Sequence, residues 1–312
     1  MAEKLDIIAI GESLIELSSE KSLAYADTLN KYYGGDTLCT AVAASRLGSK
    51  AGYITRVAND PFREFLMDSW QSEGLDISQV KLIDGFNGVY FVGHPEFEDK
   101  EFVYYRKKTA ATKLSIDDIN ENYILSADIL YATGVTQSLS LSAKEAVKRA
   151  YEIASEHSMA TAYDPNYDSK MWGEDDAKDA FDEISDKIDI LFLNLEHDCE
   201  KLFDINSPDK CIKYMWDKGI KTVVVKSPKD KGYFVGFEGD IIFEKFYTDE
   251  VADSTGSGDA FNGAFLHGLN SGMTPFESAK LASIDAGLQC HGIGAIHSIP
   301  NKEQVYKAYY EK

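Results

Sequence analysis

The chain has few basic residues, few cysteines and no long apolar segment, and each shortage excludes a class of partner or site. Only 32 of its 312 residues are Lys or Arg, against 52 Asp and Glu, so the formal net charge is −20. This charge repels phosphate backbones and anionic lipid, and we therefore expect no nucleic acid and no membrane as partners. No apolar run approaches the roughly 20 residues that span a bilayer, and the N-terminus lacks a signal-peptide pattern.

The four cysteines are isolated from one another. Cys39, Cys199, Cys211 and Cys290 form no C-x-x-C pair, and the six histidines have no metal-ligand spacing. In a chain of this length, such cysteines indicate reduced and mostly buried thiols rather than a disulfide framework. Together with the missing targeting signals, this predicts a cytoplasmic protein.

The order of apolar segments predicts one α/β domain over residues 1–312. Near-continuous apolar strands such as ADILYATG and DILFLNL alternate with helical segments at 142–157 and 177–188. Strands of this kind are typical of a parallel sheet buried on both faces. Alternating strands and helices predict a three-layer α/β/α, doubly wound sheet, with ligands at the carboxyl ends of its strands.

A different pattern interrupts this alternation. NGVYFVGH and EFVYYRK are aromatic, β-branched runs joined by a polar turn at Pro95 to Lys100, and they predict a hairpin. Because the face of a hairpin needs cover, we expect a small β lid against the main body. The lid is predicted from two segments, about 13–33 and 85–113.

The strongest chemical signal is the segment DSTGSGDAF at 253–261. Gly256, Ser257 and Gly258 form a small-residue turn before a helix, where backbone N–H groups and the helix dipole favour an anion. Such a turn suits a transferring phosphoryl group. Asp259 would repel that group, but it fits a base that accepts the proton of an attacking hydroxyl. On local physics alone, Asp259 as an ordinary helix cap is an equally good interpretation.

A second glycine turn, Gly34-Gly35-Asp36, also precedes a helix. The glycines allow close approach of a ligand, and Asp36 can bind hydroxyl groups or cap the helix. Alone, this motif is weak, and a tight turn with a cap is the favoured interpretation. Walker A and protein-kinase motifs are absent, so no phosphate-binding framework of those kinds is expected.

Taken together, GGDTLCTAVAASRLG and DSTGSGDAFNGAFL resemble the two signature regions of the ribokinase-like, pfkB-type carbohydrate kinases. The resemblance covers the whole chain and includes IAIGESLIEL, TRVANDPF and VVVKSPKDKGYFV. Within the family, GGDTL, EFVYYRKKTAA and DPNY most closely resemble the 2-keto-3-deoxygluconate kinases. The resemblance implies a ribokinase-like fold and direct, in-line phosphoryl transfer from ATP with Mg²⁺ to a hydroxyl of that sugar acid.

The resemblance also implies roles for individual residues. It makes Asp259 the base, and Gly256, Ser257 and Gly258 the anion hole. The residues that it places along the nucleotide are Asn194, Lys226, Ser227, Gly256 and Gly258. Those that it places around the sugar are Gly34, Gly35, Asp36, Tyr90, Tyr104 and Arg106. It further implies a monovalent cation such as K⁺ near Asp253 and a homodimer formed through the lid.

Arg106 has a physical reason of its own, because a guanidinium on a lid strand can bind a carboxylate bidentately. Without the family, an exposed surface arginine remains the alternative interpretation.

Three residues depart from the family pattern. Cys39 stands where the family usually has Asn, which removes one amide contact to the sugar. Asp168 stands where 2-keto-3-deoxygluconate kinases usually carry Arg, which replaces a cation by an anion. His197 stands at the last position of the usual N-x-x-E motif that begins at Asn194. Two alternatives therefore stay open: a fructokinase-like kinase of a neutral sugar, and a degenerate member that binds sugar without turnover.

Overall fold

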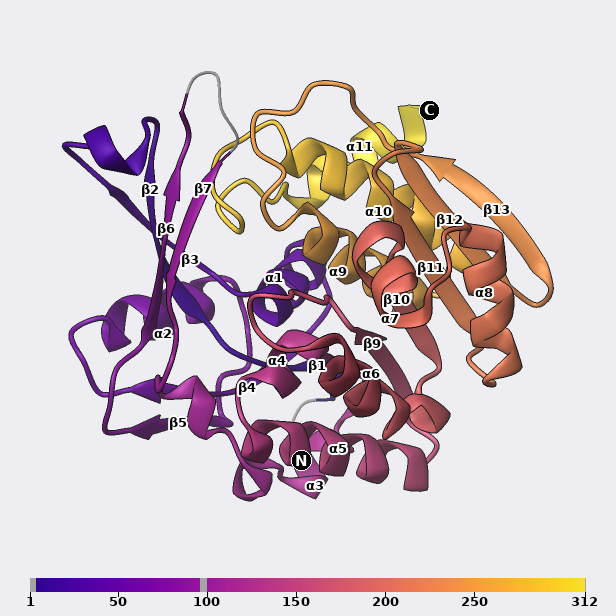
Figure 1. Ribbon diagram of the computed structural model, residues 1–312, viewed down its shortest axis with the longest axis horizontal. Helices are drawn as coiled ribbons and strands as arrows, with labels where there is room; N and C mark the ends of the chain where they lie inside the picture. Colours follow the sequence, from indigo (N-terminus) through magenta and orange to yellow (C-terminus); the bar gives the residue numbers. More distant parts are fainter. Residues whose placement is uncertain (1–3, 96–99, 312) are drawn as a thin grey trace.

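The computed structural model describes residues 4–95 and 100–311, and its main feature is a nine-stranded sheet (Figure 1). The strand order is β13-β12-β11-β10-β9-β8-β1-β4-β5. The strands are β1 (Leu5–Ile10), β4 (Ala51–Ala58), β5 (Val80–Ile83), β8 (Ala127–Thr133), β9 (Ala160–Asp164), β10 (Ile190–Asn194), β11 (Thr222–Ser227), β12 (Gly232–Phe237) and β13 (Asp240–Lys245). The seven strands β11, β10, β9, β8, β1, β4 and β5 pair in parallel, and β12 and β13 extend the sheet in antiparallel fashion.

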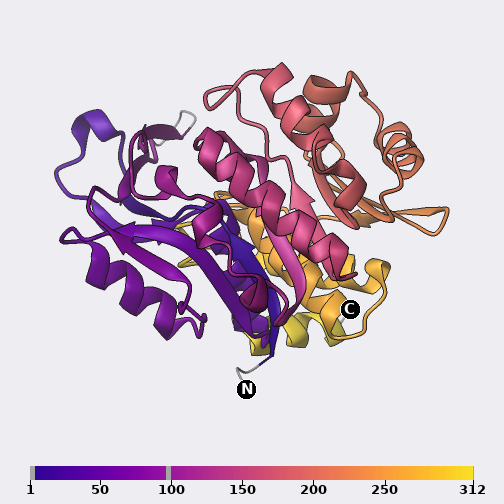
Figure 2. The same ribbon diagram turned by 90° about the horizontal axis from the view of Figure 1, so that it is seen from below.

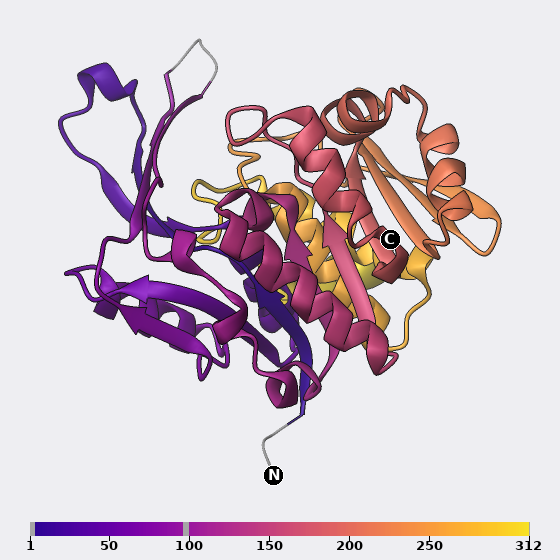
Figure 3. The same cartoon turned by 60° about the horizontal axis from the view of Figure 1, so that its bottom comes forward.

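Helices cover both faces of this sheet. They are α1 (Asp36–Leu47), α2 (Arg63–Ser72), α3 (Glu121–Ile124), α4 (Gly134–Ser138), α5 (Leu141–Glu156), α6 (Glu174–Asp182), α7 (Glu200–Phe203), α8 (Pro208–Asp217), α9 (Ser257–Asn270), α10 (Pro275–Gln289) and α11 (Lys302–Glu311). Because side chains alternate along a strand, Ile7 and Ala9 of β1 pack in the core with α1, α9 and α10. Ile8 and Ile10 pack on the other face with α5 and α8. Figures 2 and 3 show α5 and α10 on opposite sides of the sheet. The predicted three-layer α/β/α fold is confirmed.

A four-stranded sheet in the order β3-β2-β6-β7 extends beyond the main body (Figure 1). Its strands are β2 (Leu14–Ser19), β3 (Asn30–Gly34), β6 (Gly88–Gly93) and β7 (Glu101–Tyr105). The predicted hairpin is confirmed, since β6 and β7 pair antiparallel. Residues 96–99 of its predicted turn lie outside the described residues. We call this sheet the lid.

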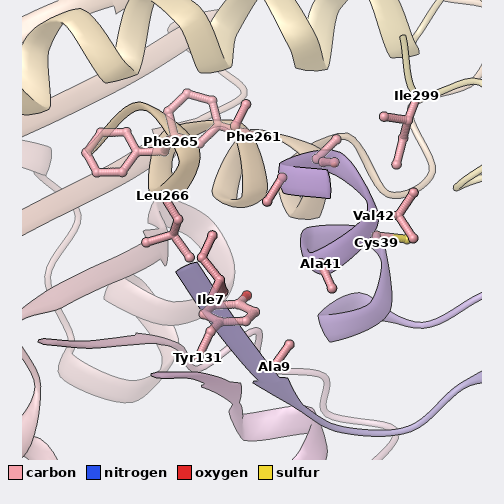
Figure 4. Packing of buried hydrophobic residues seen from close by; sticks show 14 of the residues in the cluster. Ile7, Ala9, Cys39, Ala41, Val42, Tyr131, Phe261, Phe265, Leu266 and Ile299 are labelled. Atoms are coloured by element: carbon pink, nitrogen blue, oxygen red, sulfur yellow. The ribbon is translucent and has the colours of Figure 1, made fainter. Parts of the chain in front are cut away.

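Helices α1 and α9 pack against each other unusually closely (Figure 4). A Cβ at Gly263 would lie 2.3 Å from the carbonyl oxygen of Thr40, so only glycine permits this approach. Thr40 also donates a hydrogen bond from Oγ1 to the carbonyl oxygen of Asp259, at 3.0 Å. The two helices therefore begin side by side.

One predicted boundary is wrong. The helix expected over 177–188 ends at Asp182, and a short 3₁₀ turn at Ser185–Lys187 follows. The N–H of Lys187 donates to the carbonyl of Ile184, at 2.9 Å. This tighter turn lets the chain leave the helix layer and enter β10.

All four cysteines are buried and free, as the sequence indicated. Among the residues that the structure describes, no helix is both long and apolar enough to cross a bilayer.

Candidate active site

Four neighbouring strands end in polar side chains at one edge of the main sheet. Thr133 lies opposite Asp164 in the β8–β9 pairing, and Asn194 lies opposite Lys226 in the β10–β11 pairing. Lys226 Nζ donates to Asp164 Oδ2 at 2.7 Å. The order of the strands reverses between β1 and β8, because the chain continues from β1 to β4 on one side and later returns with β8 on the other. Such switch points are where α/β sheets bind ligands.

The first glycine turn directs Asp36 toward this edge. Gly35 has φ +142°, and a Cβ there would lie 2.3 Å from the carbonyl oxygen of Glu12. Asp36 Oδ2 accepts hydrogen bonds from Thr133 Oγ1 at 2.6 Å and from Asn166 Nδ2 at 3.4 Å. Burial raises the pKa of the Asp36 carboxyl, and the hydrogen bond from Thr133 only partly offsets this. Asp36 is thus held by the last residue of β8 and by a residue just beyond β9.

The second glycine turn begins α9. Gly256 is the N-cap residue, with φ +78°. The N–H of Ser257 donates to the carbonyl of Ser254, and that of Asp259 donates to the carbonyl of Gly256. Within the described chain, the N–H groups of Gly256 and Gly258 have no such carbonyl partner. Two backbone donors at a helix N-terminus therefore remain available to an anion.

Asp259 does not cap its helix. Its side chain makes no hydrogen bond to any residue that the structure describes, and its carboxylate faces two cavities. Burial raises the pKa of Asp259 well above its usual value, and the neighbouring Asp36 carboxylate raises it further, while Lys226 opposes the shift. A half-buried, unpaired carboxylate with a raised pKa is a good candidate for a proton acceptor.

Three adjoining cavities meet at this turn. The largest, of about 410 Å³, shares Asn194, Lys226 and Gly258 with a central cavity of about 230 Å³. The third, also about 230 Å³, shares Asn166, Gly256 and Asp259 with the central cavity. Asp259 therefore lies between the lid-side cavity and the central cavity. An in-line transfer requires this arrangement, because the acceptor hydroxyl and the phosphoryl group must approach each other from opposite sides.

The lid-side cavity contains most of the residues expected to bind sugar. Those that line it are Gly35, Asp36, Tyr90, Tyr104 and Arg106. Tyr90 and Tyr104 stack with their ring centroids 5.5 Å apart. Gly34 does not line the cavity but packs behind it, where a Cβ would lie 2.5 Å from the hydroxyl of Tyr90.

Arg106 is not the surface arginine that the sequence left as an alternative. It forms an ion pair with Glu12, whose side chain is buried, and Asp168 lines the same cavity. Burial lowers the pKa of the Arg106 guanidinium to about 10, and the Asp168 carboxylate opposes this shift. The sequence did not reveal Glu12 as a partner, because the two residues meet only through the tertiary fold.

The cavity of about 410 Å³ is suited to a nucleotide. Tyr233, Phe246 and Val251 give it an apolar part, while Lys226 and Gly258 lie at its junction with the central cavity. Ser227 also lines it, and its Oγ donates to Asp230 Oδ2 at 2.6 Å.

The carboxylate missing at His197 is supplied one residue later. Residues Leu195–Cys199 form a π-helical turn, which contains one more residue than an α-helical turn. Asp198 therefore faces the central cavity and accepts hydrogen bonds from the N–H groups of Asn194, at 2.6 Å, and Tyr167, at 2.9 Å. The acidic residues of LEHD were visible in the sequence, but the extra residue in the turn was not.

Asp253 lies outside the three cavities. It is buried and forms an ion pair with Lys100 of the lid. In the described part of the chain, no three His, Cys, Asp or Glu side chains are grouped as a metal site.

Comparisons with known proteins agree with this geometry. Residues 4–302 match the family described as pfkB family carbohydrate kinase. The chain is 29% identical to the 5-dehydro-2-deoxygluconokinase of Clostridium beijerinckii, over 97% of this chain and 92% of that protein. It is 28% identical to the 2-dehydro-3-deoxygluconokinase of Thermoproteus tenax, over 96% of this chain and 93% of that protein.

The fold also matches that of a candidate Ribokinase II of E. coli, solved in complex with ATP and Mg²⁺. The TM-score is 0.90 at 23% identity, and the match covers 98% of this chain and 99% of the other. At this identity, the likeness establishes the ribokinase fold.

Asp198 provides a test of the site's electrostatics. Burial first, and the Asp164 carboxylate second, raise its pKa from 3.8 to about 7. Protonated Asp198 therefore stabilises the folded state below about pH 4, and this contribution is lost as the pH rises through about 7. When the pH is raised from 5 to 8, the free energy of unfolding should fall in the wild type by roughly 1 to 3 kcal/mol more than in Asp198→Asn. Urea unfolding at both pH values measures this, with Asp209→Asn on α8 as control. Equal losses in the wild type and Asp198→Asn would contradict the assignment.

Proposed function

The chain belongs to the pfkB family of carbohydrate kinases, and from this premise we propose that Asp259 is the base of an ATP-dependent phosphoryl transfer to a sugar hydroxyl. Membership of the family makes the protein a phosphotransferase that acts on a sugar, and it implies the use of ATP. The proposal rests mainly on one observation: the uncapped carboxylate of Asp259 stands where the lid-side and central cavities meet.

The residues of the chain suit each part of this reaction. Asp36 and the lid tyrosines orient the acceptor, and Asp259 accepts the proton of its attacking hydroxyl. The N–H groups of Gly256 and Gly258 donate to the oxygens of the group being transferred, and Lys226 adds a positive charge. The lid keeps water from the reacting hydroxyl.

The residues that would hold a nucleotide line the cavity of about 410 Å³, where Tyr233 and Phe246 could contact its base and Lys226 could pair with its phosphates. Asp164 and Asp198 line the central cavity, and Mg²⁺ commonly needs one or two carboxylates besides phosphate oxygens. When bound, ATP would supply the phosphoryl group and Mg²⁺ would neutralise charge on its phosphates. The presence of Asp198 supports an active kinase over a sugar-binding member without turnover.

The acceptor that we propose first is a sugar acid such as 2-keto-3-deoxygluconate, also named 2-dehydro-3-deoxygluconate. Relatives whose names specify dehydro-deoxygluconates support this, and so does Arg106 in the lid-side cavity. A neutral sugar such as fructose is the second candidate. Glu12 and Asp168 already offset the charge of Arg106, which leaves less of it for a substrate carboxylate.

We also propose a homodimer formed through the lid. One lid face lines the sugar cavity, while the other is an exposed apolar face. The residues of this outer face are Leu17, Leu23, Ala26, Leu29, Val89, Phe91, Val103 and Tyr105. A second copy of the lid would cover this face with a matching apolar surface.

Replacing the base tests the central assignment. Asp259→Asn should lower kcat by about 10³-fold or more while substrate binding persists, because the amide cannot take the hydroxyl proton. In the wild type, kcat should fall as the pH is lowered through the raised pKa of Asp259, above the usual Asp value of about 4. Coupled-enzyme assays of ADP release measure both, and calorimetric titration checks binding. Near-normal turnover of Asp259→Asn would rule out this base.

The charge of the sugar site separates the two acceptors. We expect the wild type to prefer a sugar acid, and Asp168→Asn to lower its KM for the acid about tenfold, because one repelling carboxylate is removed. The KM for fructose should not change. ADP release with 2-keto-3-deoxygluconate, 5-dehydro-2-deoxygluconate and fructose measures this, with Asp175→Asn on α6 as control. A higher kcat/KM for fructose than for either acid would establish the second candidate instead.

Sedimentation velocity tests the dimer. We expect a dimer for the wild type and a monomer for Val103→Glu, since a charge in the centre of an apolar interface is costly to bury. Val103 is 42% exposed, so the monomer should tolerate the change. Leu141→Glu places the same charge on an exposed leucine of α5 and should remain dimeric. A monomeric wild type would refute the proposal.

A further inference from the structure

Lys100 connects the lid to the segment that precedes the second glycine turn. It stands directly before β7, and its Nζ forms an ion pair with Asp253 Oδ1 and lies 3.5 Å from Thr255 Oγ1. Figure 1 shows the start of β7 beside the orange segment before α9 and the yellow segment before α11. The side chain of Lys100 is only 25% exposed, and that of Asp253 is 2% exposed. This ion pair is therefore largely shielded from water.

Asp253 is held as a charged carboxylate. Its Oδ1 accepts a hydrogen bond from the N–H of Thr255 at 2.9 Å, and its Oδ2 accepts one from the N–H of Gly294 at 3.1 Å. Burial alone would raise the pKa of Asp253, but the hydrogen bonds from Lys100 and Thr255 hold it below its usual value. A buried carboxylate of this kind needs a cation beside it.

A second buried carboxylate adds to this need. Glu16 of β2 accepts hydrogen bonds from the hydroxyl of Tyr90 and from the N–H of Ala295. Its pKa is raised by burial first and also by the charge of Asp253, whereas Lys100 lowers it. The charge of Lys100 thus acts on both carboxylates.

The residues around Asp253 do not fit the monovalent cation that the family resemblance implies there. Such an ion would need the oxygens of Asp253, but the ammonium group of Lys100 is already in contact with Oδ1. A second cation at the same oxygen would be repelled by the first. We propose that Lys100 is the built-in cation of this site, so that the enzyme needs no K⁺.

The contact has a second effect, because its two partners lie on different parts of the fold. Lys100 directly precedes β7 of the lid, and Asp253 lies three residues before Gly256, the N-cap of α9. The ion pair therefore holds the lid against the segment that shapes the proposed anion hole. Its effect on turnover rests on the proposed kinase function, whereas occupation of the cation site does not.

Thermal unfolding tests the occupation of the site without any activity measurement. The melting temperature of the wild type should be the same, within about 1 °C, in KCl and in choline chloride of equal ionic strength. Lys100→Met keeps the length of the side chain but removes its charge. It should melt about 2 to 4 °C lower in choline chloride, and K⁺ should restore most of this loss. Lys100→Arg should behave as the wild type.

Turnover is measured in the same two salts, with whichever of 2-keto-3-deoxygluconate, 5-dehydro-2-deoxygluconate and fructose is the best acceptor. The wild type should be equally active in both, while Lys100→Met should lose about tenfold in choline chloride and recover in K⁺. Lys107→Ala, which removes an exposed lysine after β7, is the matched control and should not respond to K⁺.

Stabilisation or several-fold activation of the wild type by K⁺ would overturn the proposal. So would a Lys100→Met variant that folds as stably as the wild type and responds to K⁺ no more than Lys107→Ala does. If no sugar is phosphorylated, the proposed function fails, but the melting temperatures still decide whether Lys100 occupies the cation site.

Discussion

The close contact between α1 and α9 is the constraint on which the site depends. Gly263 brings the two helix backbones together, and the hydrogen bond from Thr40 fixes α1 to the main chain of Asp259. Each helix begins at one of the two glycine turns, so this packing determines the separation of Asp36 and Asp259. The lid-side cavity, which Asp36 lines, meets the central cavity at Gly256 and Asp259 of the second turn.

Much of this arrangement could be predicted from the sequence, because its signals are local. A glycine turn before a helix restricts backbone geometry within a few residues, which made Asp36 and Asp259 candidates, and the family resemblance of the two turns together assigned their roles. The alternation of apolar strands and helices likewise predicted the layers. The features that sequence analysis missed depend on contacts between distant segments: Glu12 beside Arg106, and Lys100 against Asp253. Asp198 was missed for another reason, since a single π-helical turn shifts which side chain faces the cavity.

The site also shows how a strongly acidic chain can bind phosphate groups. The site does not rely on a cluster of basic residues, because its positive potential comes from backbone N–H groups and from Lys226. Lys226 and the side chain of Asn262 both donate to Asp164 Oδ2, at 2.7 and 2.8 Å, so this carboxylate is neutralised next to the central cavity. Burial raises the pKa values of Asp36 and Asp198, which reduces the negative charge that an incoming nucleotide meets. Asp259, whose pKa is also raised, has to be ionised when it acts as the base.

The hydrogen bond from Thr133 to Asp36 has a stereochemical consequence. Because Thr133 terminates β8, a strand inside the central sheet, Asp36 is fixed to the sheet rather than to a loop. In the proposed reaction, a sugar whose hydroxyls bind Asp36 would present its next hydroxyl to Asp259, because the distance between the two carboxylates is fixed. Epimers that differ at the carbons near Asp36 should then be discriminated sharply. Changes at the far end of the sugar, away from Asp36, should be tolerated more readily.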